Sequence, residues 1–121
     1  MNDTFRDIER GHEAKYKLDE ELRFKAQCRR TRLLGLWAAQ QMGMARAEAD
    51  AYAKRLVTLN LDRPGTAHIA AKVIGDLGET GVAVSETDVV AAIDRFYAEA
   101  LASLAEDFPR ALDRDHVQIG G

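Results

Sequence analysis

The first stretch of the chain that could do chemistry is HEAKY, residues 12–16. It begins like the H-E-x-x-H zinc motif, in which two histidines one helical turn apart supply two metal ligands. Tyr16 stands where the second histidine would have to be, and one His with one Glu cannot complete that site. The remaining histidines, His68 and His116, lie in separate segments. We therefore expect no metal site.

Other arrangements for catalysis are also missing from the sequence. The glycine-rich stretch GDLGETG, residues 75–81, has neither the lysine nor the preceding strand of a phosphate-binding loop, and it is interpreted as a helix end. No serine has a histidine near it in sequence, and neither does the single cysteine, Cys28. Glu20 and Glu21 are adjacent and face different sides of a helix. We expect a protein that is not an enzyme and that needs no cofactor.

Arg29, Arg30 and Arg32 form a basic cluster with two alternative interpretations. The cluster is either a nucleotide contact, which would suit a nucleotide-responsive regulatory bundle, or helix surface whose long stems lie over the core. A nucleic-acid partner is not expected, because such proteins usually present a face of one positive sign. Residues 1–32 hold nine Lys or Arg and seven Asp or Glu, the rest hold eight and thirteen, and the formal net charge is −3.

The hydrophobic pattern of this 121-residue chain predicts one all-α domain, a four-helix bundle. The helices are expected at about 18–42, with a start as early as Phe5 as the alternative for this first helix, then at 45–60, at 66–77 and from Ser85 to Phe108. Gly43 should stop the first helix and Thr66 should cap the third, while Ser85 and Asp88 form a capping box. Trp37 is expected as the central aromatic residue of the core. The longest uncharged run, residues 33–45, is short of the ~20 residues of a membrane span.

The segment before the bundle is densely charged and has only a thin apolar stripe. Isolated helices of this length are marginal in water, and Gly11 costs about 1 kcal/mol of helicity relative to alanine. The sequence therefore predicts three parts: a mobile, partly helical N-terminal arm (residues 1–17), the bundle (18–108) and a frayed, disordered C-terminal tail (109–121).

Residues 5–43, FRDIERGHEAKYKLDEELRFKAQCRRTRLLGLWAAQQMG, carry a long and compositionally unusual pattern. Its matching positions are Phe5, Glu9-Arg10, Glu13, Lys15, Tyr16, Phe24-Lys25-Ala26, Arg29-Arg30, Arg32-Leu33-Leu34-Gly35 and Trp37-Ala38-Ala39. This stretch resembles the start of the zeta subunit of alphaproteobacterial F-type ATP synthases. The likeness is looser after Gly43 and continues to about Phe108. Ile8, Gly11 and the longer tail depart from the family pattern.

The resemblance implies a four-helix bundle that inhibits the synthase. In that family the arm is inserted as a helix between the catalytic head and the central rotor stalk, where it blocks rotation in the direction of ATP hydrolysis. The expected partners are therefore the catalytic head and the central stalk. The protein is expected to be cytoplasmic, and peripheral to the inner membrane when it is bound to the synthase. When free, it is expected to be a monomer. The partner-binding residues are expected to be three apolar anchors and five charged contacts. They are Phe5, Ile8 and Tyr16, and Arg6, Glu9, Arg10, Glu13 and Lys15.

Overall fold

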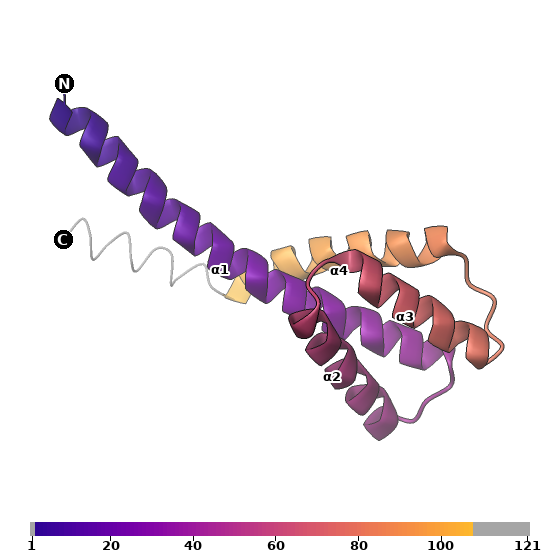
Figure 1. Cartoon of the computed structure of the whole chain (residues 1–121). Helices are drawn as coiled ribbons and strands as arrows, with labels where there is room; N and C mark the ends of the chain where they lie inside the picture. The colour runs from indigo at the N-terminus through magenta and orange to yellow at the C-terminus, as the bar shows by residue number, and fades with distance from the viewer. Residues whose placement is uncertain (1, 108–121) are drawn as a thin grey trace.

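The computed structural model describes residues 2–107 of the chain, with the side chains of residues 20–106. Four α-helices follow one another: α1 (Asn2–Gln41), α2 (Arg46–Asp62), α3 (Thr66–Glu79) and α4 (Glu86–Asp107) (Figure 1). Within the described residues there is no strand. The predicted all-α, four-helix fold is confirmed. The expected tail, residues 109–121, lies outside the described part.

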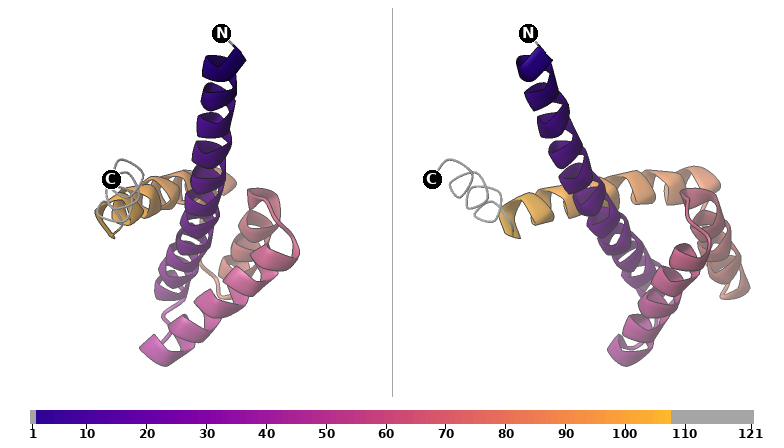
Figure 2. Two further views of the ribbon diagram at one scale, coloured as in Figure 1. Left: turned by 90° about the vertical axis from the view of Figure 1, so that its left-hand side faces the viewer. Right: turned by 60° about the vertical axis from the view of Figure 1, so that its left-hand side comes forward.

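The first helix is much longer than the others, because its 40 residues extend over about 60 Å. Its C-terminal half packs along α2 and α4 and also reaches α3. Its N-terminal half runs on past the other three helices, and both views of Figure 2 show it leaving the bundle. Among the described side chains, Ala26 is the first along the chain to be buried. The bundle therefore covers only the second half of α1.

The main core consists of aliphatic and aromatic side chains contributed by all four helices. Its buried members are Leu34, Ala38, Ala39, Tyr52, Leu56, Ile69, Val73, Leu77, Val89, Ala92, Ile93 and Phe96. A smaller cluster of Ala26, Ala100 and Leu104 joins α1 to α4 nearer the arm. Trp37 is half-buried and packs against the main core, with its ring edge-on to Phe96 at 6.5 Å between centroids. The expectation that Trp37 is the central aromatic was wrong, since Tyr52 and Phe96 are the more deeply buried rings.

The helix ends follow the turn residues of the sequence, with one exception. Gly43 ends α1 with φ of 74°, and the N–H of Met44 donates to the carbonyl of Ala39 at 3.0 Å. This is the Schellman arrangement, which satisfies carbonyls that the helix end leaves free. The exception is Thr66, which is the first residue of α3 and not its cap. The cap position belongs to Gly65, whose φ of 108° favours glycine.

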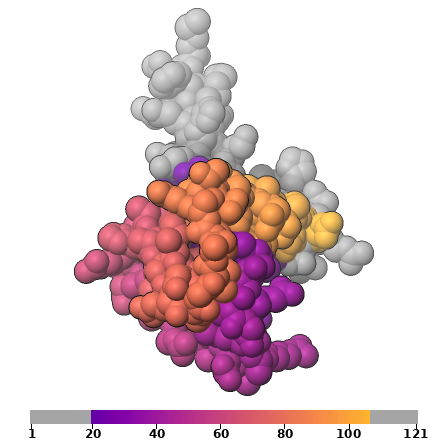
Figure 3. Space-filling view, turned by 90° about the vertical axis from the view of Figure 1, so that its right-hand side faces the viewer, coloured from indigo at the N-terminus to yellow at the C-terminus, as the bar shows by residue number. Residues whose placement is uncertain are grey.

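The predicted capping box at the start of α4 is present. The N–H of Asp88 donates to Oγ of Ser85 at 3.1 Å, and the N–H of Ser85 donates to Oδ2 of Asp88 at 3.3 Å. Figure 3 views the molecule from the end opposite the arm, where the α3–α4 connection and the start of α4 lie beside the C-terminal end of α1. The two ends of the molecule thus differ, with closed turns at one and the protruding half of α1 at the other.

Candidate functional site

The N-terminal arm forms the first turns of α1. The helix begins at Asn2 and continues through Gly11 and Lys17 without a break. All eight expected partner-binding positions, from Phe5 to Tyr16, therefore fall on one continuous helix. Their side chains lie outside the described part, so the contacts expected of them stay predictions. On a helical backbone, positions 5, 8, 12 and 16 share one face.

The three arginines of the basic cluster are divided between two environments. Arg30 is 6% exposed and lies inside the bundle, whereas Arg29 is half-buried and Arg32 is exposed. Adjacent residues of a helix point about 100° apart, so Arg29 and Arg30 cannot face the same side. Arg29 donates a hydrogen bond to the hydroxyl of Ser103 on α4. The cluster of the sequence is therefore not one continuous surface in the structure.

Neutral groups from three helices hold the guanidinium of Arg30. Its Nη2 donates to Oδ1 of Asn60 at 3.1 Å, and the ring of Tyr97 lies 5.8 Å from its Cζ. Burial lowers the pKa of Arg30 from its usual value. Asn60 stands near the C-terminus of α2, where the helix dipole favours a positive charge. Nδ2 of Asn60 in turn donates to the carbonyl of Gly65 at 2.7 Å, so that α1 is connected to the α2–α3 turn.

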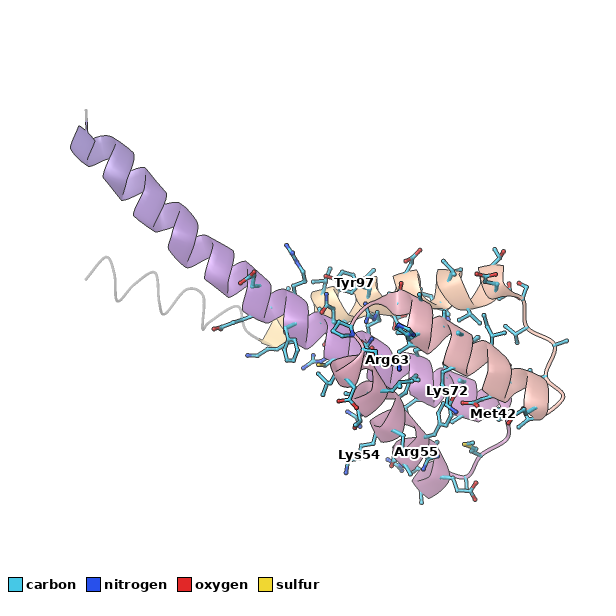
Figure 4. The ribbon with its side chains drawn as sticks, in the orientation of Figure 1. Met42, Lys54, Arg55, Arg63, Lys72 and Tyr97 are labelled. Atoms are coloured by element: carbon cyan, nitrogen blue, oxygen red, sulfur yellow. The ribbon has the colours of Figure 1, made fainter. Side chains whose placement is uncertain are left out.

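Arg29 and Arg32 both line an open pocket of about 1070 Å³ between α1 and α2, whereas Arg30 does not. We call this the basic pocket, because four cations and one acid line it: Lys25, Arg29, Arg32 and Lys54, with Asp50. Its apolar lining includes Phe24, which is 54% exposed, and the half-buried Val57. In Figure 4 Lys54 projects from α2 on the side away from α3. The exposed Phe24 and the surrounding cations make this surface suitable for binding a partner.

A second pocket, of about 470 Å³, lies at the other side of α2, next to Met42 and Lys72 (Figure 4). Here the hydroxyl of Tyr52 donates to Oδ2 of Asp76 at 2.8 Å, and Nζ of Lys72 lies 3.1 Å from Oδ1 of the same carboxylate. The pKa of Tyr52 is raised above its usual value. The larger cause is burial, and the smaller is the hydrogen bond to Asp76. Since every polar atom of this triad has a partner within the bundle, its first effect is to fasten α2 to α3.

Sequence reasoning singled out Arg29 and Arg32, which line the basic pocket. It missed the pocket itself and the Tyr52–Asp76 contact, because both join residues of different helices. The pocket pairs residues 24–32 with residues 47–58, and 24 positions separate Tyr52 from Asp76. The signals available in the sequence were Phe24, an aromatic residue of the family pattern flanked by charges, and the pair Arg29 and Arg32.

The described residues offer neither a metal site nor a membrane span. Among residues 2–107, no group of three or more His, Cys, Asp or Glu is placed to hold a metal ion. No helix in the same range has the length and apolar character needed to cross a bilayer. His68, the one histidine with a described side chain, is exposed.

Comparison with known proteins places the chain in a family. The family model described as ATPase inhibitor subunit zeta matches residues 2–103, which include both the arm and nearly all of the bundle. No curated protein matches the chain. Because the match covers most of its length, the chain belongs to the family of the ATPase inhibitor subunit zeta.

Proposed function

We propose that this protein inhibits ATP hydrolysis by an F-type ATP synthase and that its arm, residues 1–17, is the inhibitory element. The arm enters as a helix between the catalytic head and the rotor stalk and blocks rotation. The observation that carries the proposal is the match of the inhibitor family to residues 2–103, which includes the arm. The protrusion of α1 beyond the bundle supports it, since a wedge must reach past its own domain.

The energetics of such a wedge are reasonable. Ordering a backbone costs about 1–2 kcal/mol per residue, and the cleft contacts have to exceed that cost. An arm that continues a helix of the bundle has fewer conformations to lose. Phe5, Ile8 and Tyr16 supply apolar anchors, and the charges between them suit a polar cleft. The bundle binds outside the cleft and keeps the arm at a high effective concentration.

Deletion of residues 2–17 tests the role of the arm. The shortened protein should keep its melting temperature, because Ala26 is the first buried side chain among the described residues 20–106. It should lose inhibition of ATP hydrolysis by the purified synthase of its own organism. Undiminished inhibition by the shortened protein would contradict the arm mechanism.

The apolar anchors are tested by the double substitution Phe5→Ala and Ile8→Ala. Anchors that fill pockets at an interface account for much of its binding energy, so the half-inhibitory concentration should rise at least about tenfold. Val90→Ala is the matched control, because Val90 is a 44% exposed apolar residue of α4. A marked drop in melting temperature for the double variant would mean that the arm packs on its own bundle, against the proposal.

A further inference from the structure

The basic pocket has the form of a groove between two helices. On α1 it is lined at positions 24, 28 and 32, and on α2 at positions 47, 51, 54 and 58. Spacings of three and four place each set along one side of its helix. The α2 row alone covers 11 residue steps, or roughly 16 Å. A partner helix lying between two such rows would find side chains at every turn.

The chemistry of the pocket specifies an acidic and partly apolar occupant. Arg32 and Lys54 are exposed cations, and Asp50 is the one acid among the residues that line the pocket. Phe24 offers an aromatic face to solvent, and Ala51 is small enough for another helix to approach closely. An amphipathic helix with apolar side chains along its centre and Asp or Glu beside them complements both features.

The position of the pocket relates it to the arm. Phe24 follows Lys17 by seven residues on the same helix, a rise of about 10 Å. A protein engaged by the arm would thus lie within about one helix diameter of this pocket. We infer that the basic pocket is a second docking site, which receives an acidic amphipathic helix on the catalytic head of the synthase. This inference rests on the proposed function.

Two other occupants are less favoured. In a symmetric pair each copy presents the same patch to the other, so a second copy of this chain would bring two sets of cations together. A nucleotide could use the cations, but it has only its base to set against Phe24, Ala51 and Val57. Each of these occupants would give a distinct result in binding experiments.

The test uses the full chain and the purified catalytic head. Lys54→Glu and Phe24→Ala should each raise the dissociation constant for the head about tenfold, which is the range for a buried anchor or a charge facing its complement. Lys54→Glu should also weaken the salt dependence of binding, because it removes a charge contact. The controls are Arg63→Glu, an exposed arginine at the C-terminal cap of α2 and outside the pocket, and Val90→Ala. Both should bind as the unsubstituted protein does.

Cys28 supplies an independent readout, since it is the single cysteine and lines the pocket. Its alkylation by N-ethylmaleimide should slow when the head is bound. Unchanged alkylation in the complex, or equal binding by the pocket and control variants, would overturn the inference. So would dimerisation that Lys54→Glu abolishes, or protection of Cys28 by millimolar ATP or ADP in place of the head. If the unsubstituted protein inhibits hydrolysis while pocket variants match the controls, only the docking site fails. If the unsubstituted protein does not inhibit, the proposed function itself fails.

Discussion

The burial of Arg30 could not be predicted from its position in the sequence. It stands between Arg29 and Arg32 in a motif that suggests a surface for anions, yet it is buried and bonded to Asn60 and Thr31. The stem of an arginine can cover apolar surface while its head finds partners, and this one does so inside the bundle. The partner Asn60 is 30 residues away, so no local pattern could have assigned it.

The hydroxyl of Tyr52 should contribute measurably to stability. Tyr52→Phe removes its hydrogen bond to Asp76 and should lower the free energy of unfolding by about 1 kcal/mol at pH 7. The pKa of Tyr52 is raised in the folded protein, so above pH ~10 the unfolded chain loses this proton first. The contribution of Tyr52 is therefore fully present below pH ~10 and is lost as the pH rises further. Urea titrations of both proteins between pH 7 and 11 measure it.

The comparison with Tyr52→Phe isolates one of the three tyrosines, since Tyr16 and Tyr97 are common to both proteins. The gap in stability should be constant from pH 7 to about 9 and should shrink above about 10. A gap that widens with alkali would show that the hydroxyl is not held in its neutral form.

At the scale of the helices, the crossing of α1 and α2 depends on Gly35. A Cβ at this position would lie 2.7 Å from Cα of Ala53, and backbone cannot move aside cheaply. Gly35→Ala should therefore lower the free energy of unfolding by about 1–3 kcal/mol, although alanine is the better helix former. A Cβ added at Gly75 in α3 would meet no other atom within 4 Å, so Gly75→Ala is the matched control.

The control should raise stability by up to about 1 kcal/mol, because it gains helix propensity in open space. Chemical denaturation of the two variants measures the difference. Equal stabilisation by both substitutions would mean that the α1–α2 crossing can accommodate a Cβ at position 35.

Local chemistry made most of the fold predictable. The 3.6-residue period indicated four helices. Gly43 correctly predicted the end of α1, and the capping box of Ser85 and Asp88 correctly predicted the start of α4. The positions of Thr66 and Trp37 were wrong for reasons of three-dimensional packing. Gly65 is the N-cap of α3 because the α2–α3 turn needs a positive φ. Phe96 and Tyr52 fill the centre of the core, and Trp37 packs at its edge.

At the scale of the whole molecule, substitutions that change the helicity of the arm test whether it inhibits as a helix. Gly11 lies inside α1, so Gly11→Ala should favour the helix by about 1 kcal/mol, and Gly11→Pro should break it. If the arm acts as a helix, the half-inhibitory concentration should fall up to about fivefold for alanine and rise steeply for proline. Hydrolysis assays with the purified synthase measure both, and circular dichroism reports the change in helicity.

Equal potency of the alanine and proline variants would exclude a helical arm in the inhibited complex. Gly11 precedes Ala26, the first buried side chain among the described residues, by 15 positions, so the melting temperature of the bundle should stay constant. A shift in that temperature would instead point to contacts between the arm and the bundle.

The two candidate sites differ in how well they could be predicted from the sequence. The arm was recognisable because Phe5 to Tyr16 form a continuous pattern. The basic pocket was not, since Phe24 and Lys54 approach only after α1 and α2 pack as a pair. Leu104, from the far end of the chain, also lines it.

The continuity of α1 has a consequence for how the arm acquires its conformation. Starting a helix is the unfavourable step, whereas adding residues to an existing one is nearly neutral. The packed half of α1 already supplies the nucleus, so the arm only has to propagate it toward Asn2. Cut from the bundle, the same peptide would have to nucleate by itself. The bundle thus serves as a template for the conformation of its own arm, in addition to carrying it.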